Sequence, residues 1–141
     1  MFYKPLLLPL LALVLLTFVV WVYMYVTRLS EIRRKSIDPQ ALDTRAHGQA
    51  LLTDSPEPLD NLKNLFELPI LFYVAIMLAL VLMIQDQALV QLAWGYVALR
   101  CLHSLVHCTY NRVMHRFTAY AASCLVLMFM WARLAGYILM H

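Results

Sequence analysis

A run of 21 predominantly apolar residues, from Leu6 to Val26, limits what this chain can fold into more than any other feature. A helix needs about 20 such residues to cross the hydrocarbon core of a bilayer. The run exceeds the roughly 7–15 residues of a signal-peptide apolar region and lacks an A-x-A-like cleavage site, so a retained membrane helix is predicted. The chain as a whole is 63% hydrophobic, against roughly 45–50% for soluble domains, so it is expected to be a membrane protein.

The sequence predicts three further membrane spans, at about residues 62–84, 88–107 and 117–139. Residues 27–60 are polar and proline-containing, so they form the expected extramembrane loop. A kink is expected at Pro69, inside the second span, because proline lacks a backbone donor. The three residues 85–87 leave room only for a tight turn. Together these features predict an all-α, four-helix transmembrane bundle, with residues 1–141 as one domain that contacts the lipid bilayer.

The distribution of basic residues predicts how the bundle is oriented. Four spans place both termini on the same side of the membrane. Lys4 and Arg133 are the two basic residues expected on that side. Eight are expected on the other side: Arg28, Arg33, Arg34, Lys35, Arg45, Lys63, Arg112 and Arg116. By the positive-inside rule both termini are expected to be non-cytoplasmic. These cations are spread through the loops without interleaved exposed aromatic residues, so no nucleic-acid partner is expected.

The third predicted span carries a polar stripe. Arg100, His103, His107 and Asn111 are spaced by three and four residues, which places them on one face of a helix. An ionisable group that faces lipid costs at least roughly 2.5 kcal/mol, so the stripe is expected to face protein or water. The sequence therefore predicts a polar site inside an assembly.

Simpler interpretations of the polar residues remain open at this stage. Arg100 could form a structural ion pair with Glu67, and His103 a hydrogen bond between helices. His103 and His107 share a helical face and could also bind a metal, with Glu67 or His115 completing the set; no metal site is assigned. The three cysteines lack CxxC spacing and are expected to be buried, mostly inert thiols.

One ordered set of motifs resembles a known family. The third-span pattern Arg100-x2-His103-x3-His107-x8-Arg116-x3-Tyr120 is similar to that of the MAPEG family, the membrane-associated proteins in eicosanoid and glutathione metabolism. Two further segments agree with this resemblance: Tyr25-Val26-Thr27-Arg28 at the end of the first span, and Asn64-Leu65-Phe66-Glu67 in the second. The form of the second segment looks most like small bacterial members, which implies a bacterial inner membrane.

The resemblance implies a homotrimer that binds glutathione between subunits and acts on a lipophilic small molecule from the bilayer. It implies that Arg28, Arg100 and Arg116 hold the glutathione carboxylates or stabilise its thiolate, and that Asn64 and Glu67 bind its amino end. Cations close to a thiol favour the thiolate. The expected catalytic residues are Arg116 and His107. The expected glutathione-binding residues are Arg28, Asn64, Glu67, Arg100, His103 and Tyr120.

The chain departs from the family pattern at two places. His107 stands where the family usually has a tyrosine, and the Arg-Ala-His that commonly precedes the second-span asparagine is missing there. The implied activity is a glutathione-dependent transferase or peroxidase. The alternative is a non-catalytic membrane protein that binds a lipid or a partner protein, because one fold can serve either role.

Overall fold

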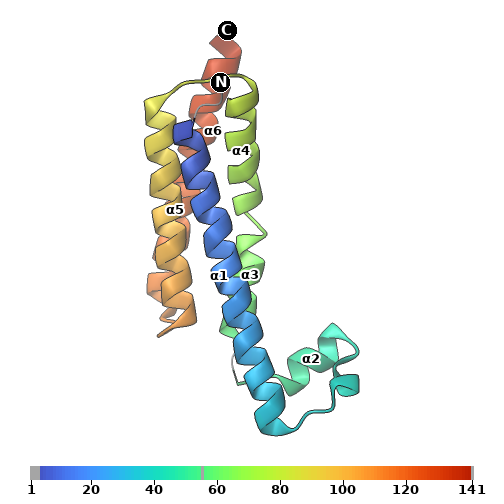
Figure 1. Ribbon diagram of the computed structural model, residues 1–141. Helices are drawn as coiled ribbons and strands as arrows, with labels where there is room; N and C mark the ends of the chain where they lie inside the picture. The colour runs from blue at the N-terminus through green and yellow to red at the C-terminus, as the bar shows by residue number, and fades with distance from the viewer. Residues whose placement is uncertain (1–3, 55, 141) are drawn as a thin grey trace.

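The structure is a computed structural model that describes residues 4–54 and 56–140, and all regular structure in these residues is helical (Figure 1). The long helices are α1 (Lys4–Lys35), α5 (Gln87–Cys108) and α6 (Val113–Met140). Helices α3 (Glu57–Leu65) and α4 (Pro69–Val81) follow one another along the bundle. A short 3₁₀ helix, η1 (Pro39–Leu42), and α2 (Arg45–Leu51) form a small lobe beside the end of α1.

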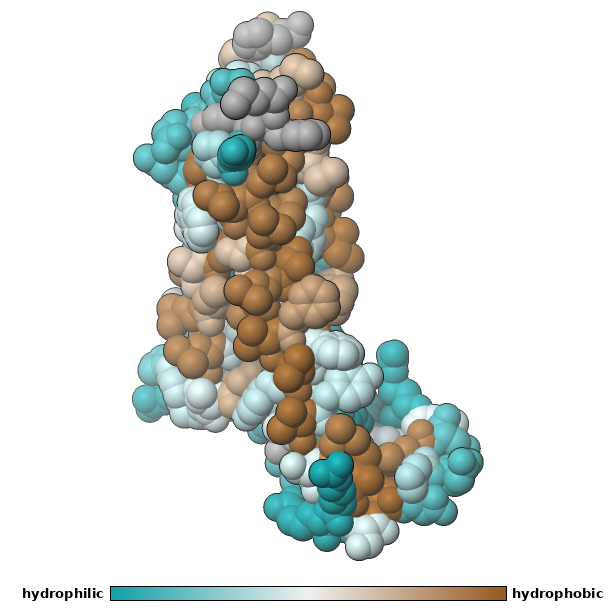
Figure 2. Space-filling model, in the orientation of Figure 1, coloured by the Kyte–Doolittle hydropathy of each residue, from teal (hydrophilic) through white to brown (hydrophobic). Residues whose placement is uncertain are grey.

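Four segments are long and apolar enough to cross a membrane: α1, α3 together with α4, α5, and α6. The first residues of α1 and the last residues of α6 lie at the same end of the bundle, and the α2 lobe lies at the other end (Figure 1). Apolar surface covers the middle of the bundle, and hydrophilic surface gathers towards both ends (Figure 2). The predicted all-helical membrane bundle is therefore confirmed.

Helix α1 continues nine residues beyond the expected end of its span at Val26, as far as Lys35. Its last turn contains Arg33, Arg34 and Lys35, and cations near a helix C-terminus are stabilised by the helix dipole. The helix stops where Ser36 adopts a left-handed conformation (φ 51°), and the amide of Ile37 donates to the carbonyl of Ile32. Arg28 therefore lies within a helix, although a loop was expected to begin at Thr27.

The second span is divided into two helices, α3 and α4, and Pro69 is the first residue of α4. Proline is tolerated at a helix start, where its missing N–H has no intrahelical acceptor, but it disrupts a helix interior. The chain consequently makes a break between Leu65 and Pro69, where a kinked but continuous helix was expected. This break matters for the site because Asn64 and Glu67 lie on either side of the end of α3.

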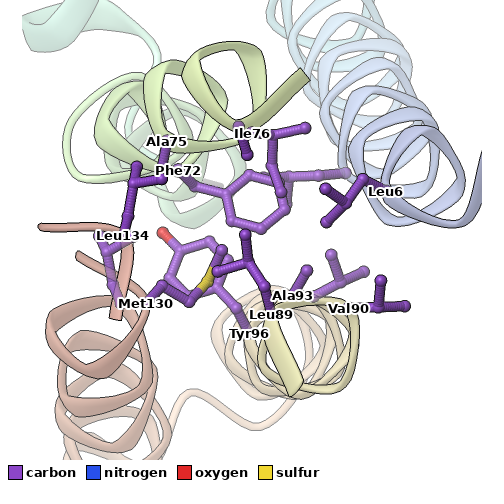
Figure 3. Packing of buried hydrophobic residues seen from close by; sticks show 14 of the residues in the cluster. Leu6, Phe72, Ala75, Ile76, Leu89, Val90, Ala93, Tyr96, Met130 and Leu134 are labelled. Carbon is purple, nitrogen blue, oxygen red and sulfur yellow. The ribbon is translucent and has the colours of Figure 1, made fainter. Parts of the chain in front are cut away.

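The apolar core lies between α1, α4, α5 and α6, and Figure 3 shows how its labelled side chains pack. The aromatic rings of Phe72 on α4 and Tyr96 on α5 stack with centroids 4.8 Å apart. Leu6 and Leu13, seven residues apart, belong to one face of α1 and are completely buried in this core. Many other apolar side chains of α1 are exposed, as expected for a helix whose surroundings are lipid.

An ion pair closes the bundle at the end that carries the termini. Asp86 is only 6% exposed, its carboxylate accepts from the amide of Ala88 at 3.0 Å, and it also pairs with Arg133 of α6. Its side chain therefore caps α5 and connects that helix to α6. The hydrogen bond from Arg133 holds the pKa of Asp86 below its ordinary value of 3.8.

We expect Asp86 to stabilise the fold in a pH-dependent way. Asp86→Ala should lower the free energy of unfolding by about 1–3 kcal/mol, through loss of the cap and of the ion pair. Asp86→Asn keeps an oxygen that can cap α5 and should cost less. Because the folded-state pKa is lowered, the stability advantage of the unmodified protein over Asp86→Asn should be full near neutral pH and shrink below about pH 4. Circular dichroism during unfolding in detergent measures these differences, with Gln85→Ala as an exposed control. Parallel curves for the unmodified protein and Asp86→Asn down to about pH 3 would contradict this role.

Candidate functional site

A polar cavity of about 450 Å³ lies between α3, α5 and α6, near the end of the bundle opposite the termini. Its volume falls in the range of roughly 300–1,000 Å³ that is typical of small-molecule sites. The residues that line it are Asp60, Lys63, Asn64, Glu67, His103, His107, Val113, Arg116, Phe117 and Tyr120. Six of the eight residues predicted for the site are among them.

The two histidines come from consecutive turns of α5. His103 and His107 are 2% and 3% exposed, and their ring centroids are 5.6 Å apart. The Nδ1–H of His103 donates to the carbonyl oxygen of Arg116 on α6 at 3.1 Å. A hydrogen bond between helices, one of the simpler interpretations of His103, is therefore present. When the ring of His103 is neutral and Nδ1 carries the proton, Nε2 has the lone pair and can accept a hydrogen bond.

Arg116 is held at the cavity by the turn between α5 and α6. Its Nη1 donates to the side-chain oxygen of Asn111 at 2.8 Å and lies 3.4 Å from Nε2 of His107. Asn111 adopts a left-handed conformation (φ 45°), which asparagine tolerates better than most residues. Helix α6 begins at Val113, four residues before the expected span, so Arg116 lies in its first turns. The guanidinium group is thus oriented and half-buried beside the cavity.

Arg100 is completely buried behind the cavity wall. Its Nη2 donates to the backbone oxygen of Asn64 at 2.7 Å, and its guanidinium carbon is 5.5 Å from the ring centroid of Tyr120. Within the described residues, Nε and Nη1 have no hydrogen-bond partner, and Arg100 makes no ion pair. The ion pair considered with Glu67 is therefore not formed, because Glu67 is exposed and Arg100 bonds to the end of α3. A buried cation without an anion costs several kcal/mol, so this position favours an anionic ligand.

Helix α3 and the residues just after it form the opposite wall of the cavity and carry its carboxylates. Lys63 pairs with Asp60 at 3.0 Å, and Asn64 and Glu67 also line the cavity. The mouth of the cavity includes Phe117 of α6, which is 62% exposed. The cavity thus combines a cation on α6, a paired cation on α3, carboxylates on and just after α3, and an apolar edge.

Asn61 supports this wall and was not among the predicted site residues. Asn61 is completely buried, accepts a hydrogen bond from the hydroxyl of Ser104 at 3.2 Å, and donates to the sulfur of Cys108 at 3.4 Å. These contacts hold α3 against α5. A signal was present, because Pro58, Asn61 and Leu65 share one helical face and a polar residue on a buried face needs a partner.

Arg28 is the predicted site residue that is placed elsewhere. It lines a separate, larger cavity between α1, α2 and α3, together with Tyr25 and Arg45. Within one subunit the chain therefore does not bring Arg28 to the histidines.

The alternative of a metal site concerns His103 and His107, with Glu67 or His115 as a further ligand. Residues 4–54 and 56–140 contain no group of three or more His, Cys, Asp and Glu side chains suited to hold a metal ion. His115, one suggested third ligand, lies next to Tyr110, with its Nδ1 3.1 Å from the hydroxyl oxygen.

Cys101 was expected to be buried but is exposed on the bundle surface, whereas Cys108 and Cys124 are half-buried.

The fold and the cavity define a small integral membrane protein, a bundle of four spanning segments with a charged pocket near one membrane surface. The family model for the MAPEG family matches residues 6–136, nearly the whole chain. The chain therefore belongs to the MAPEG family, as its motifs suggested. No curated protein and no solved structure matches it significantly.

Proposed function

We propose that this protein is a glutathione-dependent transferase or peroxidase that acts on lipophilic electrophiles, with glutathione in the cavity between α3, α5 and α6. The observation that carries the proposal is the buried, unpaired guanidinium of Arg100 behind a cavity that also presents Arg116. Guanidinium groups match the geometry of carboxylates, so both arginines favour an anionic ligand. Membership of the MAPEG family makes glutathione the ligand of choice.

The charges around the cavity complement those of glutathione, which has two carboxylates, one ammonium group and an ionisable thiol. Arg116 and Lys63 are the cations on the walls, Arg100 is buried behind them, and Asp60 and Glu67 are the carboxylates. In this proposal Asn64 and Glu67 bind the ammonium end, while His103 and Tyr120 contact the middle of the molecule. Arg28 lines a different cavity of its own subunit, so in the proposed trimer it would contact the glutathione of a neighbouring subunit.

Arg116 and His107 are the proposed catalytic residues. The Nε2 of His107 accepts a hydrogen bond from Arg116, so in the proposed step it takes the thiol proton as Arg116 turns from His107 to the sulfur. Arg116 then stabilises the thiolate by a charge-assisted hydrogen bond. The thiolate forms a C–S bond with the electrophilic carbon, and the leaving group departs with the electron pair. With a hydroperoxide, the thiolate attacks the terminal oxygen, the O–O bond breaks, and the alkoxide leaves as the alcohol with the proton from His107. A second glutathione converts the sulfenic acid to disulfide and water.

The electrophile reaches the thiolate from the bilayer. Val113 and Phe117 line the cavity and are 62% exposed on the surface of α6. Apolar side chains at a cavity edge provide a path for a lipophilic substrate that a purely polar rim would not.

The proposed active form is a homotrimer, as the resemblance implies, with each cavity near a contact between subunits. The exposed apolar surface of the bundle is available for such contacts as well as for lipid. We expect the mass of the protein in mild detergent, measured by light scattering with the detergent subtracted, to be three times that of one chain. A purely monomeric species that still binds glutathione would contradict the trimeric site.

The proposed location is the bacterial inner membrane, with both termini on the non-cytoplasmic side. Eight of the eleven basic residues lie at or beyond the membrane end that carries α2, which favours a cytoplasmic position for that end. A phosphatase reporter fused to the C-terminus should therefore be active outside the cytoplasm. Activity of a cytoplasm-specific reporter at the same position would reverse the orientation.

The role of Arg116 separates this enzyme from a non-catalytic binding protein. Loss of a charge-assisted hydrogen bond, worth roughly 1.5–3 kcal/mol, raises a thiol pKa by about one to two units. Arg116→Ala should therefore raise the pKa of bound glutathione by that amount and abolish turnover of a model electrophile. Ultraviolet thiolate absorbance, measured as a function of pH on detergent-purified protein, reports the pKa directly.

Arg112→Ala is the matched control, because Arg112 is exposed four residues earlier and does not line the cavity. It should change neither the thiolate pKa nor turnover. Equal effects of both substitutions would indicate general electrostatics of the basic membrane face. The absence of any thiolate signal in the unmodified protein would reject glutathione activation and leave non-catalytic binding of a lipid or protein partner.

A further inference from the structure

The turn between α5 and α6 contains Asn111, a polar residue that has no role in the proposed mechanism. Asn111 was predicted to share a helical face with His107, but it lies in the turn after the end of α5. Its backbone is left-handed (φ 45°), and its amide donates to the carbonyl oxygen of Val106 at 2.8 Å. This bond closes the end of α5, as residues in this conformation often do. The backbone of Asn111 therefore forms the turn and leaves its side chain available for another contact.

The side chain of Asn111 contacts Arg116, which lies five residues later in the first turns of α6. Its oxygen accepts from Nη1 of Arg116 at 2.8 Å, an ordinary length for a hydrogen bond. The same Nη1 lies 3.4 Å from Nε2 of His107 on α5. An Nη nitrogen carries two hydrogens, so one can point to Asn111 and the other to His107. Arg116 is thus held between an amide oxygen and an imidazole nitrogen.

No carboxylate compensates the charge of Arg116. None of the ion pairs within residues 4–54 and 56–140 includes this arginine. Asp60 and Glu67 line the same cavity, but Asp60 pairs with Lys63. An amide oxygen orients a guanidinium group without adding a negative charge. The positive charge of Arg116 therefore stays available to an anion in the cavity.

Proton transfer from glutathione to His107 changes the contacts of Arg116. When the S–H bond breaks, its electron pair stays on the sulfur, and the proton forms an N–H bond at Nε2 of His107. The protonated ring can no longer accept from Nη1, and the two neighbouring positive charges repel each other. One hydrogen of Nη1 is then free for the sulfur, while the other can remain on Asn111. The guanidinium group can therefore turn towards the sulfur without leaving the cavity.

We propose that Asn111 is a positioning residue for thiolate formation. Its side-chain oxygen keeps Nη1 of Arg116 at the cavity while the second hydrogen of that nitrogen passes from His107 to the glutathione sulfur. The proposal rests on the proposed glutathione function, and Asn111 acts through Arg116 without touching the reacting atoms. A donor that is already oriented stabilises a developing charge better than a mobile one, because it needs no reorganisation during the step.

Two substitutions separate the hydrogen bond from the shape of the turn and from charge. Asn111→Gly removes the side-chain oxygen but keeps a residue that adopts the left-handed conformation without strain. Asn111→Asp keeps an acceptor and tolerates the same conformation, but it adds a negative charge beside Arg116. The first variant should release Arg116, and the second should hold it while offsetting its charge.

The first measurement needs no glutathione. Phenylglyoxal modifies arginine side chains, and peptide mass spectrometry of the full-length protein in detergent gives separate rates for Arg116 and for the exposed Arg112. Asn111→Gly should accelerate modification of Arg116 by about threefold or more, whereas Asn111→Asp should not. The rate at Arg112 should be unchanged in both variants. Equal rates at Arg116 in the unmodified protein and in Asn111→Gly would overturn the proposal, and so would equal acceleration at both arginines, which would indicate a loosened turn.

The second measurement follows turnover and the thiolate absorbance of bound glutathione. Asn111→Gly should lower kcat by about tenfold and change KM for glutathione by less than about twofold, because the lost bond orients a group that acts after glutathione has bound. It should raise the pKa of the bound thiol by less than Arg116→Ala does. Asn111→Asp should raise this pKa as well, because its carboxylate offsets the charge of Arg116.

A double substitution shows whether Asn111 acts through Arg116. Asn111→Gly should add nothing to the thiol pKa measured in Arg116→Ala, because the contact that it removes is already absent. An additive shift would overturn the positioning role. The absence of a thiolate in the unmodified protein would reject the proposed function together with this role, whereas unchanged thiolate formation and turnover in Asn111→Gly would reject this role alone.

Discussion

The structure depends on one constraint, that backbone polar groups inside a bilayer must be hydrogen-bonded within the chain. Four helical segments satisfy it, and their apolar side chains face both the core and the lipid. Charged side chains are consequently gathered towards the two ends, with Arg100 as the deep exception. At the end with the termini, Asp86 and Arg133 form a closed pair. At the opposite end, the polar groups of α3, α5 and α6 surround a cavity.

The difference between these two ends explains why the anion-binding site is assigned to the end opposite the termini. Asp86 has its charge and its capping role satisfied, so it has no unmet requirement for a ligand. Arg100 is equally buried, yet two of its nitrogens lack partners in the described residues. Its neighbours are held by other contacts: His103 by the backbone of α6, and Arg116 by Asn111. The site is therefore rigid around an uncompensated charge, which is the arrangement expected of a preorganised anion receptor.

Much of the polar site could be predicted from the sequence because helical periodicity is a local property. The spacing of Arg100, His103 and His107 placed them on one face of α5, and the structure buries all three. The break before Pro69 was harder to predict from the sequence, because a proline inside an apolar run is compatible with either a kink or a new helix start. The extension of α1 to Lys35 was missed because its polar sequence was interpreted as loop. Asn61 was missed because its importance depends on contacts with Ser104 and Cys108 on another helix.

The sequence by itself determined the class of the protein, its four spans and its family, because apolar length, helical spacing and motif order need no knowledge of distant contacts. Only the tertiary structure decided which polar residues meet. It joined Arg100 to the end of α3 instead of to Glu67, and it placed Arg28 under α2 in a separate cavity. The reason is that such pairings depend on where helices end and how they pack, and residues 36 positions apart carry no local signal of their contact.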